Sequence, residues 1–541
     1  MSNQFTVRRF FTLTALFGVV FLNQLFAQKK SLNPVYDPAP IVVPAGSLEA
    51  MTNDSIEVFT AYCYTNGGFR PSLFQIDEVD AKGRFLREND AIADSNDQVV
   101  FMPIGTGDRA PTDQWIDGSD NVRLELEVTD PLTNEKGWLY LFRHVKTPPK
   151  VDPYVRYVRG PETVGSDTVF ATSYIEAHDP QGWFTDTRIR TPFGDGVDIL
   201  DRQKVRVGGV FGIFRVTLKD EENVLYRYVR HGGGPVRVLR EYGIKVTFLG
   251  AVIDSTGSFF TQYFPYSTVF GAQEAKIPVI SGLTVNLIRQ SVDLNDRAVG
   301  MKFFNAFNRN GLIVDGVADS PIDKTITDPP DGLNWFMITG NPGTILTIMN
   351  IPVIGSKREL YYLDDATIDN GDTGDKKSYG DSGILVTSTG NITGTFSFDF
   401  TTYYLAKNQA VTTGDQFKQR AVNPWQVTAV KQTRTISAVS ENLAQPTGFE
   451  LADATPNPFA PQLGYVRIGF NLGQTNVQPN LRIFNLLGQE VARFEAADLL
   501  RNHAVLWNGR DRFGRVVPAG IYFYELEAGR QRAVKKLVVL R

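Results

Sequence analysis

The sequence predicts an all-β, multi-domain protein in which a large antiparallel β-sandwich body precedes a small C-terminal β-sandwich. Apolar and polar residues alternate with a period of two in many short stretches, as in 236–248, and this pattern is typical of half-buried strands. The 541 residues include 48 glycines, 29 prolines and 12% aromatic residues, which favours strands and turns. Stretches with the 3.6-residue period of an amphipathic helix are few.

Residues 1–27 have the pattern of a secretory signal peptide. Arg8 and Arg9 precede the apolar run Phe10–Leu22, and Ala27 supplies a small residue before a cleavage site at Gln28. At about thirteen residues the apolar run is too short for a comfortable membrane span, and no later stretch is longer. We therefore expect export and a mature protein without an integral membrane span. Cys63 is the only cysteine, so no disulfide bond can form within the chain.

Residues 28–150 are expected to form an N-terminal β-rich region that contains an acidic loop. In this loop Asp90, Asp94, Asn96 and Asp97 bring several oxygen ligands close together. One hypothesis is a calcium site, because calcium prefers carboxylate and carbonyl oxygens. The loop lacks the ordered twelve-residue ligand pattern of the well-known calcium loops and the glycine at its sixth place. The alternative is an acidic turn exposed to solvent.

Residues 151–440 are expected to form the large β-sandwich. Its predicted strands include 205–218, 224–229, 236–248, 258–264, 283–288, 335–339, 345–349, 360–363 and 393–404. In 236–248 one face is mostly apolar and the other is mixed, which indicates a sheet packed on a second sheet. Gly233–Val238, followed by Tyr263–Tyr266, resembles the mutarotase-like supersandwiches of polysaccharide lyases and related sugar-active proteins. That resemblance implies a polysaccharide as the partner.

Sugars are bound by aromatic platforms, arginines and carboxylates. The candidate glycan-binding residues in the body are Trp183, Tyr226, Tyr228, Arg230, His231, Tyr263 and Tyr266. In a lyase, a tyrosine or histidine would remove the proton α to a uronate carboxylate while an arginine neutralises that carboxylate. The alternative is that these are ordinary strand residues.

No established catalytic motif is complete. Gly380–Gly383 has the Gly-Asp-Ser-Gly sequence of a protease nucleophile turn, but Ile384 stands where the next glycine is needed, and we predict a glycine-rich hairpin instead. His231–Gly234 is similar to a lipase oxyanion loop, yet no Gly-x-Ser-x-Gly follows it. Four histidines and one cysteine disfavour a zinc site of the usual ligand sets.

Residues 441–453 are expected to be a linker, and 454–541 to be a small sandwich of about seven short antiparallel strands. Short alternating runs such as Val466–Phe470 and Gly520–Leu526 are separated by turn-forming stretches such as Asn508–Gly514. Pro456 and Pro458, close to the start, remove two backbone donors and favour an extended entry into the domain.

Five motifs of this segment, taken in order, resemble the type A C-terminal sorting domain of the type IX secretion system. They are Asn457–Phe459, Ile483–Val491, Trp507–Asp511 with Gly514, Val517–Tyr524 and the basic end Lys535–Arg541. The pattern is also similar to the immunoglobulin-like domain of flagellar hook-capping proteins, so the resemblance implies an immunoglobulin-like β-sandwich. The residues that carry the sorting signal by this resemblance are Pro456, Asn457, Pro458, Gly488, Gly520, Tyr522, Lys535, Lys536 and Arg541.

In that family the sorting domain is recognised by an outer-membrane translocon and is usually removed by a sorting peptidase, which leaves the cargo released or attached to lipopolysaccharide. The resemblance therefore implies passage through the periplasm to the cell surface or the medium. Residues 450–541 carry twelve basic and eight acidic side chains, so the rest of the chain has a formal charge of −8. An acidic body argues against nucleic acid as a partner.

Two hypotheses remain for the body. It is either a non-catalytic surface protein that binds glycans or has an adhesive or structural role, or a polysaccharide-active enzyme, in particular a lyase acting on uronate-containing glycans. A cleft lined by Tyr, His and Arg would favour the enzyme, and a face without convergent polar groups would favour the binder.

Overall fold

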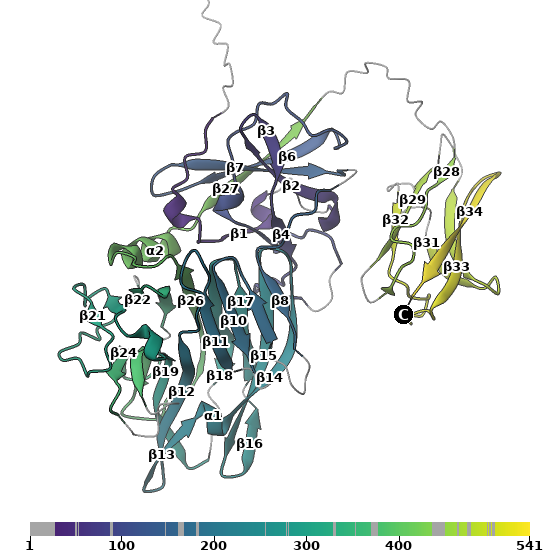
Figure 1. Ribbon diagram of the computed structural model, residues 1–541. Helices are drawn as coiled ribbons and strands as arrows, with labels where there is room; N and C mark the ends of the chain where they lie inside the picture. The colour runs from purple at the N-terminus through teal and green to yellow at the C-terminus, as the bar shows by residue number, and fades with distance from the viewer. Residues whose placement is uncertain are drawn as a thin grey trace, which may run out of the picture. The chain divides into compact units, whose positions relative to one another are not determined.

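The computed structural model confirms the all-β, multi-domain fold class (Figure 1). The structure describes residues 28–540 except 49–50, 52–53, 87–89, 146–147, 161–166, 180–182, 255, 277–278, 280, 328–331, 352, 369–376, 435–448, 462–464, 473–477, 495, 497–498 and 500–503, and except the side chains of 225–227, 251, 253–254 and 256–258. The predicted signal peptide, Arg541 and most of the predicted linker lie outside these residues. The chain divides into two compact units between residues 435 and 436.

The N-terminal region consists of two small sheets that pack face to face. One has the order β1-β5-β4, with strands Ile41–Pro44, Gln98–Phe101 and Phe74–Asp77. The other has the order β27-β6-β7-β2-β3, with strands Gln426–Thr433, Val122–Thr129, Lys136–Arg143, Phe59–Thr65 and Gly68–Pro71. Val99 and Phe101 meet Leu124, Leu139 and other apolar side chains in the core between them.

The last strand of this unit joins sequence-distant parts of the chain. β27 lies within the span that we assigned to the large sandwich, yet it pairs along its whole length with β6, from Gln426 opposite Thr129 to Thr433 opposite Val122. The chain therefore returns to the N-terminal region after completing the large sandwich. The N-terminal region also contains four short 3-10 helices among its described residues, η1 (Pro34–Tyr36), η2 (Ala45–Leu48), η3 (Ile56–Val58) and η4 (Pro103–Gly105). A further one, η5 (Asp296–Ala298), lies in the large sandwich.

A ten-stranded antiparallel sheet forms the centre of the large sandwich (Figure 1). Its order is β14-β15-β17-β18-β26-β23-β22-β20-β21, and β16 pairs with β15 beside β17. The strands are β14 (Val224–Gly233), β15 (Val238–Phe248), β16 (Ala251–Asp254), β17 (Thr256–Tyr263), β18 (Ser267–Lys276), β20 (Lys302–Asn305), β21 (Leu312–Ile313), β22 (Leu333–Gly340), β23 (Gly343–Asn350) and β26 (Thr395–Leu405).

Two further sheets complete the body. The five-stranded sheet β13-β12-β19-β25-β24 comprises Phe214–Lys219, Leu200–Phe211, Leu283–Leu294, Ser378–Thr387 and Lys357–Asp365. The four-stranded sheet β11-β10-β9-β8 comprises Phe184–Ile189, Tyr174–His178, Asp167–Phe170 and Arg156–Val158. The single strand predicted for 205–218 is wrong. It is the hairpin of β12 and β13, which turns at Gly212 and Ile213, where Gly212 has φ +62°.

Side chains alternate between the two faces of each strand, so the ten-stranded sheet has an inner and an outer face. Phe336 and Ile338 of β22 point inward and pack with Leu360 and Ile384 of the five-stranded sheet. Near the other end of the sheet, Val238 and Tyr263 pack against Tyr174 and Ile189 of the four-stranded sheet. The alternate residues, such as Trp335 and Met337, lie on the outer face. The inner face thus forms the core of the sandwich.

Helix α2 (Thr412–Val422) covers part of the outer face through Phe417, which packs with Trp335 and Tyr403. The second helix, α1 (Asp220–Asn223), is a single turn between β13 and β14. Among the described residues, neither helix has the length and apolar character needed to cross a membrane.

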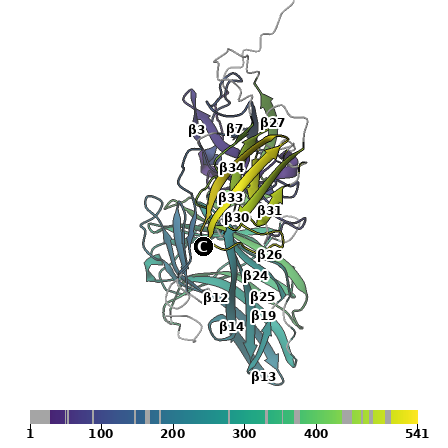
Figure 2. The ribbon, with the colours of Figure 1, turned by 90° about the vertical axis from the view of Figure 1, so that its right-hand side faces the viewer.

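The C-terminal unit is a seven-stranded sandwich. One sheet has the order β28-β29-β32 and the other β31-β30-β33-β34, whose strands lie side by side in Figure 2. The bounds are Glu450–Leu451, Val466–Asn471, Ala504–Trp507, Glu490–Phe494, Pro479–Asn485, Gly520–Ala528 and Gln531–Val539. If the strands are lettered A to G in chain order, these sheets are A-B-E and D-C-F-G; strands C, F and G share a sheet as in immunoglobulin-like domains, and the fourth strand pairs with C. The Tyr522 hydroxyl donates to the Pro518 carbonyl at 2.7 Å, which is the tyrosine corner found at the start of strand F in such domains.

Candidate functional site

A groove lies on the outer face of the ten-stranded sheet. It consists of three adjoining hollows of about 340, 520 and 460 Å³. Gln262 of β17 borders all three, Phe260 is shared by the first two, and Asn350 with Asp399 is shared by the last two. Each hollow is in the size range of small-ligand sites. Because the three hollows adjoin one another in a row, together they suit an elongated ligand.

The N-terminal region forms one wall of the groove and is fixed to the sheet by buried polar contacts. The Arg237 guanidinium donates to Asp77 from Nε at 2.9 Å and to Gln98 at 2.8 Å, and it also donates to Gln262 at 3.0 Å. The backbone N–H groups of Val236 and Arg237 both donate to Gln75 Oε1. These contacts hold the wall before any ligand binds, which lowers the entropy cost of binding.

A loop of the same region closes the other end of the wall. Arg230 of β14 donates to the carbonyl oxygens of Phe85 and Leu86 at 2.7 Å and pairs with Glu241 at 2.6 Å. Lys82 pairs with Glu274 at 3.0 Å. Arg230 therefore anchors the loop that borders the groove.

The floor combines amide and carboxylate groups with an aromatic ring. Gln262, Gln273 and Asn350 contribute amides, and Asn350 Nδ2 donates to Asp399 Oδ1 at 3.4 Å. The walls of the groove crowd Asp399 although solvent reaches it, and this desolvation raises the pKa of its carboxyl. The Phe260 ring lies against Gly271 of the next strand, where a Cβ atom would come within 2.9 Å of the ring. Amides and carboxylates beside an aromatic face are the groups that bind sugar hydroxyls and C–H faces.

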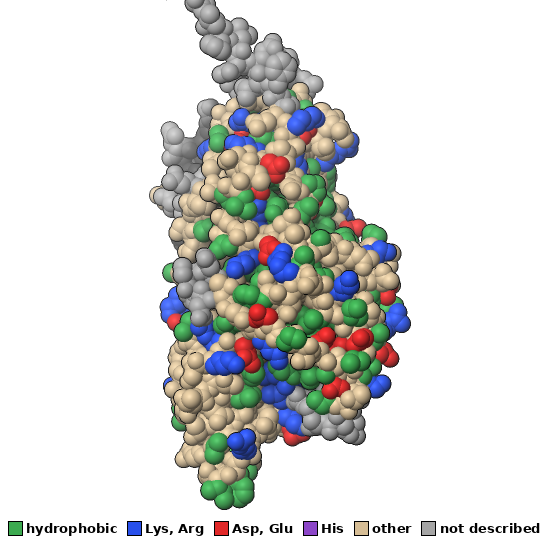
Figure 3. Space-filling view, turned by 90° about the vertical axis from the view of Figure 1, so that its left-hand side faces the viewer, with side chains coloured by type: hydrophobic (Ala, Val, Ile, Leu, Met, Phe, Trp, Pro, Cys, Tyr) green, Lys and Arg blue, Asp and Glu red, His purple; other side chains and the backbone are tan. Residues whose placement is uncertain are grey.

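The charged groups around the groove are balanced. The Arg84–Asp80 contact of 2.7 Å adds a third ion pair to the Lys82 and Arg230 pairs. On the face of the molecule shown in Figure 3, blue and red side chains interleave without a broad region of one sign. A ligand held in this groove would be recognised by hydrogen bonds and stacking rather than by a strong field of one sign.

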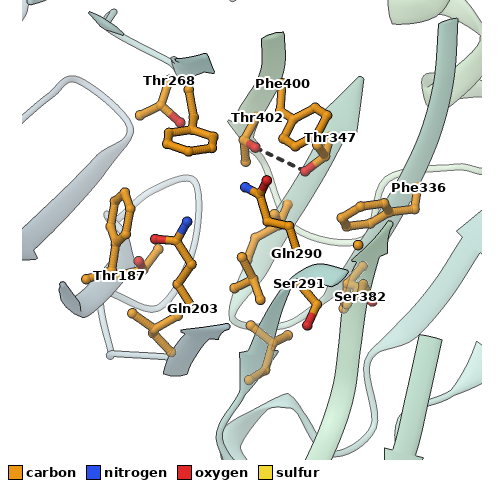
Figure 4. Close-up of a pocket in the computed structure, with 18 of the residues that line it drawn as sticks. Thr187, Gln203, Thr268, Gln290, Ser291, Phe336, Thr347, Ser382, Phe400 and Thr402 are labelled. Atoms are coloured by element: carbon orange, nitrogen blue, oxygen red, sulfur yellow. Dashed lines mark hydrogen bonds between the residues drawn. The ribbon is translucent and has the colours of Figure 1, made fainter. Parts of the chain in front are cut away.

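A second, internal cavity of about 110 Å³ lies where the ten-, five- and four-stranded sheets meet. Gln203 of β12 and Gln290 of β19 project into it beside the Thr347–Thr402 hydroxyl pair (Figure 4). Glu176 of β10 also borders it and accepts a hydrogen bond from Tyr404. Burial raises the pKa of Glu176 to about 7, although the hydrogen bond from Tyr404 opposes the shift. The cavity is too small for an oligosaccharide.

The predicted glycan-binding residues of β14 lie on both faces of the sheet. A bulge places Tyr228 opposite Tyr242 and Arg230 opposite Glu241, so Arg230 reaches the groove and Tyr228 does not. The Tyr228 hydroxyl and His231 Nδ1 are 2.6 Å apart, and Arg159 lies over the Tyr228 ring at 4.2 Å. The structure therefore groups Tyr228 with His231, away from Arg230. The side chain of Tyr226 lies outside the described residues.

The other three predicted residues are elsewhere. Tyr263 is fully buried and its hydroxyl is 3.0 Å from His178 Nε2, while Tyr266 is also buried. These rings are part of the core, so in this structure neither presents a face to a glycan. Trp183 precedes β11 and its backbone N–H donates to Asp179; it does not line the groove. Of the seven candidates, the structure places Arg230 at the groove and Tyr228 with His231 outside it.

Three of the four predicted calcium ligands, Asp90, Asn96 and Asp97, form hydrogen bonds with the backbone through their side chains. The buried Asp97 carboxylate accepts from the N–H groups of Val79 and Asp94 at 3.1 and 2.7 Å. Asp90 accepts from Ile92 N–H at 2.8 Å, and Asn96 donates to the Val79 carbonyl. Within the described part of the chain, no three His, Cys, Asp or Glu side chains gather as a metal ion requires. The acidic loop is thus organised by Asx-type turns.

The Gly-Asp-Ser-Gly sequence is not a hairpin as predicted, because it lies within β25. The Ser382 hydroxyl donates to the Gly380 carbonyl at 2.6 Å, and Asp381 is paired with Lys204. His178, a histidine that could otherwise serve such a serine as its base, is hydrogen-bonded to Tyr263. These contacts give Ser382 no catalytic base.

Several residues that resemble the sorting signal come together at one end of the C-terminal unit. Asn457 donates to the Lys536 carbonyl and accepts from Val538 N–H, both at 2.9 Å. In the neighbouring strand, Gly520 lies opposite Val539 and Tyr522 opposite Leu537. Pro456 and Pro458 flank Asn457 in the chain, and Lys535 pairs with Asp453 at 2.7 Å. Gly488 has φ +75° in the turn between β30 and β31, a conformation that glycine adopts without strain.

Sequence reasoning missed most of the groove. Gln262, Asn350 and Asp399 come from three strands that are far apart in the chain, and amides on strands have no distinctive spacing. One available signal was Asp399 within the otherwise aromatic and hydroxyl-rich stretch 395–405. A carboxylate there is unusual on a central strand.

Comparisons with known proteins do not identify a family. No family model and no curated protein significantly matches the chain. Among solved structures, the chain is similar at 10% identity to PorZ, a surface component of the type-IX secretion system of Porphyromonas gingivalis, over 70% of this chain and 69% of that one, with a TM-score of 0.15. An alpha-mannosidase from Enterococcus faecalis is similar at 9% identity over 87% of this chain and 53% of that one, with a TM-score of 0.29. Dimeric latent PorU from Porphyromonas gingivalis is similar at 9% identity over 83% of this chain and 42% of that one, with a TM-score of 0.14. These TM-scores are too low to support an inference about this chain.

Proposed function

We propose that the body binds an extended, neutral or weakly charged glycan in the groove on the outer face of its ten-stranded sheet. The observation that carries this proposal is the row of three adjoining hollows lined by Gln262, Asn350, Asp399 and Phe260. A chain of sugar rings would occupy the row, the amides and Asp399 would bond its hydroxyls, and the Phe260 ring would pack against a sugar face.

We further propose that the protein is exported through the type IX secretion system and acts at the cell surface or in the medium. The support is the order of sequence motifs in 454–541 together with the predicted signal peptide. The translocon and its sorting peptidase would then be partners of the C-terminal unit, and lipopolysaccharide a further partner if the body stays attached.

The alternative is a lyase acting on uronate-containing polysaccharides. The pair formed by Tyr228 and His231, with Arg159 over the tyrosine ring, contains the base and the cation that such a reaction uses. His231 is exposed. This group lies outside the groove, so the two functions are separable by mutation.

Binding to an array of immobilised oligosaccharides and polysaccharides tests the principal proposal. We expect the full-length protein to bind extended chains and to ignore the matching monosaccharides. Asp399→Ala and Asn350→Ala should each weaken binding about tenfold, or about 1.4 kcal/mol, since each removes hydrogen bonds to the ligand.

The matched control is Asp296→Ala, which removes an exposed carboxylate of η5 that does not border the groove, and it should bind normally. Absence of binding across the array, or equal loss in the control, would contradict the proposal. Incubating the protein with uronate polymers and recording absorbance near ~235 nm, where the unsaturated elimination product absorbs, tests the alternative. Product formation that Tyr228→Phe abolishes and Asp399→Ala leaves intact would favour the lyase.

A further inference from the structure

A buried cluster of one lysine and two aspartates lies in the five-stranded sheet and takes no part in the groove. Lys204 of β12 is within 2.6 Å of Asp293 on β19 and 3.1 Å of Asp381 on β25, and all three side chains are fully buried. Three neighbouring strands thus each contribute one reactive group. An amine and two carboxyls that are buried together are in an unusual chemical situation.

The choice of lysine is informative. Lys204 is the only lysine among the buried residues of the described chain. The other buried ion pairs use arginine, as in Arg206–Asp220, Arg237–Asp77 and Arg420–Asp130. Arginine is the usual cation for buried pairs because its guanidinium stays charged and satisfies several acceptors. A lysine amine differs in that it becomes a nucleophile once it loses a proton.

The carboxyl of Asp293 is held as an acceptor for such an attack. Its Oδ1 accepts from Tyr379 N–H at 3.0 Å and from the Ser378 hydroxyl at 3.3 Å. Both donors come from the start of β25, where the register with β19 shifts between Val292 and Leu294. Donors directed at a carboxyl oxygen stabilise the negative charge that develops there when a nucleophile adds to the carbon.

Asp381 is placed to move protons. Its Oδ2 contacts the Lys204 amine, and its Oδ1 is buried with no hydrogen-bond partner among the described residues. A buried acceptor oxygen without a hydrogen-bond partner costs free energy. Burial and the neighbouring Asp381 raise the pKa of Asp293 to about 8, which favours the protonated form of the Asp293 carboxyl beside the Lys204 amine.

We propose that Lys204 and Asp293 condense into an intramolecular amide cross-link between β12 and β19, with Asp381 as the proton acceptor. The ammonium first gives a proton to Asp381 along their existing contact. The neutral amine nitrogen then attacks the Asp293 carboxyl carbon, the nitrogen–carbon bond forms, and the Asp293 hydroxyl leaves as water with a second proton from the nitrogen. One amide and one water are formed, Asp381 ends protonated, and no oxidant or cofactor is consumed.

The geometry supplies what the reaction needs. The reacting groups are in contact, which replaces a bimolecular encounter by a reaction of preset groups. The link would close a loop between residues 89 positions apart in the chain. Such a link would restrict the unfolded chain as a disulfide does. The chain has one cysteine and so cannot form a disulfide within itself.

Peptide mapping of the purified full-length protein tests the proposal directly. Trypsin should fail to cut after Lys204, and peptide 203–206 should be joined to peptide 290–297 with the loss of one water, about 18 Da. Quantitative recovery of free peptide 290–297, with cleavage after Lys204, would overturn the proposal. A link from Lys204 to peptide 378–407 would overturn the assignment of Asp293 as the acceptor.

Variants separate the roles. Asp293→Asn should still form the link but lose ammonia, about 17 Da, instead of water. Asp381→Asn should leave Lys204 and Asp293 unlinked, because the proton acceptor is gone. Asp220→Asn is the matched control, since it alters a buried pair with Arg206 on the same strand, and its link should be unchanged. If the Asp293→Asn protein lacked the cross-link and the Asp381→Asn protein contained it, the assigned roles would be contradicted.

Discussion

Buried ionisable residues are the distinctive local feature of this body. Glu176 borders the internal cavity, and its Oε2 has no hydrogen-bond partner among the described residues. His178, two positions along β10, is buried as well, and burial holds its pKa well below the ordinary value. Burial therefore favours the neutral form of both groups, because ionisation in the core costs solvation.

Glu176 should make the stability of the body fall as the pH rises. The pKa of its carboxyl is about 7 in the folded chain against an ordinary value of 4.5. Between these values the folded state binds more protons than the unfolded state, so the free energy of unfolding is highest below pH 4.5 and decreases until the pH exceeds 7. The whole decrease attributable to this residue is about 3 kcal/mol.

Urea unfolding of the wild type and of Glu176→Gln isolates this effect when it is compared from about pH 5 to about pH 8, because this range covers the titration of Glu176. The variant keeps an acceptor for Tyr404 and has no charge to desolvate. It should match the wild type at the acidic end and be more stable at the basic end. A constant difference across the range would show that Glu176 does not carry the pH dependence.

The strands and helices show how tertiary contacts override local preference. Helix α2 contains Gly414, a residue that normally weakens a helix by about 1 kcal/mol relative to alanine. Here a Cβ atom on Gly414 would come within 2.4 Å of the Trp335 ring. The glycine therefore allows the helix to lie directly on β22.

Gly414→Ala should destabilise the body despite its higher helix propensity. The added methyl group collides with the buried Trp335, and overpacking of this kind costs about 1–3 kcal/mol, which exceeds the gain in propensity. Thermal unfolding should show a lower midpoint. Gln416→Ala, at an exposed position of the same helix, is the control and should unfold at the wild-type temperature or slightly above; a stabilised Gly414→Ala protein would refute this packing.

At the level of the whole molecule, the chain is organised as a body and a C-terminal unit, and the proposed roles divide in the same way. The groove belongs to residues 39–425 and the motifs that resemble the sorting signal to 456–541. Deleting Lys535–Arg541 would remove half of β34, so a sorting defect of that variant could reflect an unfolded domain. Surface charge reversal is a cleaner test.

The double variant Lys535→Glu/Lys536→Glu should remain in the periplasm of the organism that encodes the protein, because the basic end of β34 is part of the motif. Fractionation and surface labelling measure this, and circular dichroism of the purified variant checks folding. Arg530→Glu, in the exposed turn before β34, is the matched control and should be displayed normally. Normal display of the double variant would contradict a sorting role for these lysines.

By itself the sequence determined the fold class and the small C-terminal sandwich, because a period of two, turn residues and ordered motifs are local signals. Only the tertiary structure decided that β27 joins β6, that 205–218 is a hairpin, and that Tyr228 and Arg230 lie on opposite faces of one sheet. Long-range strand pairing and single-residue bulges leave little trace in local sequence, yet they decide which side chains meet. For the same reason the groove residues Gln262 and Asp399 and the Lys204 cluster became visible only when distant strands were brought together.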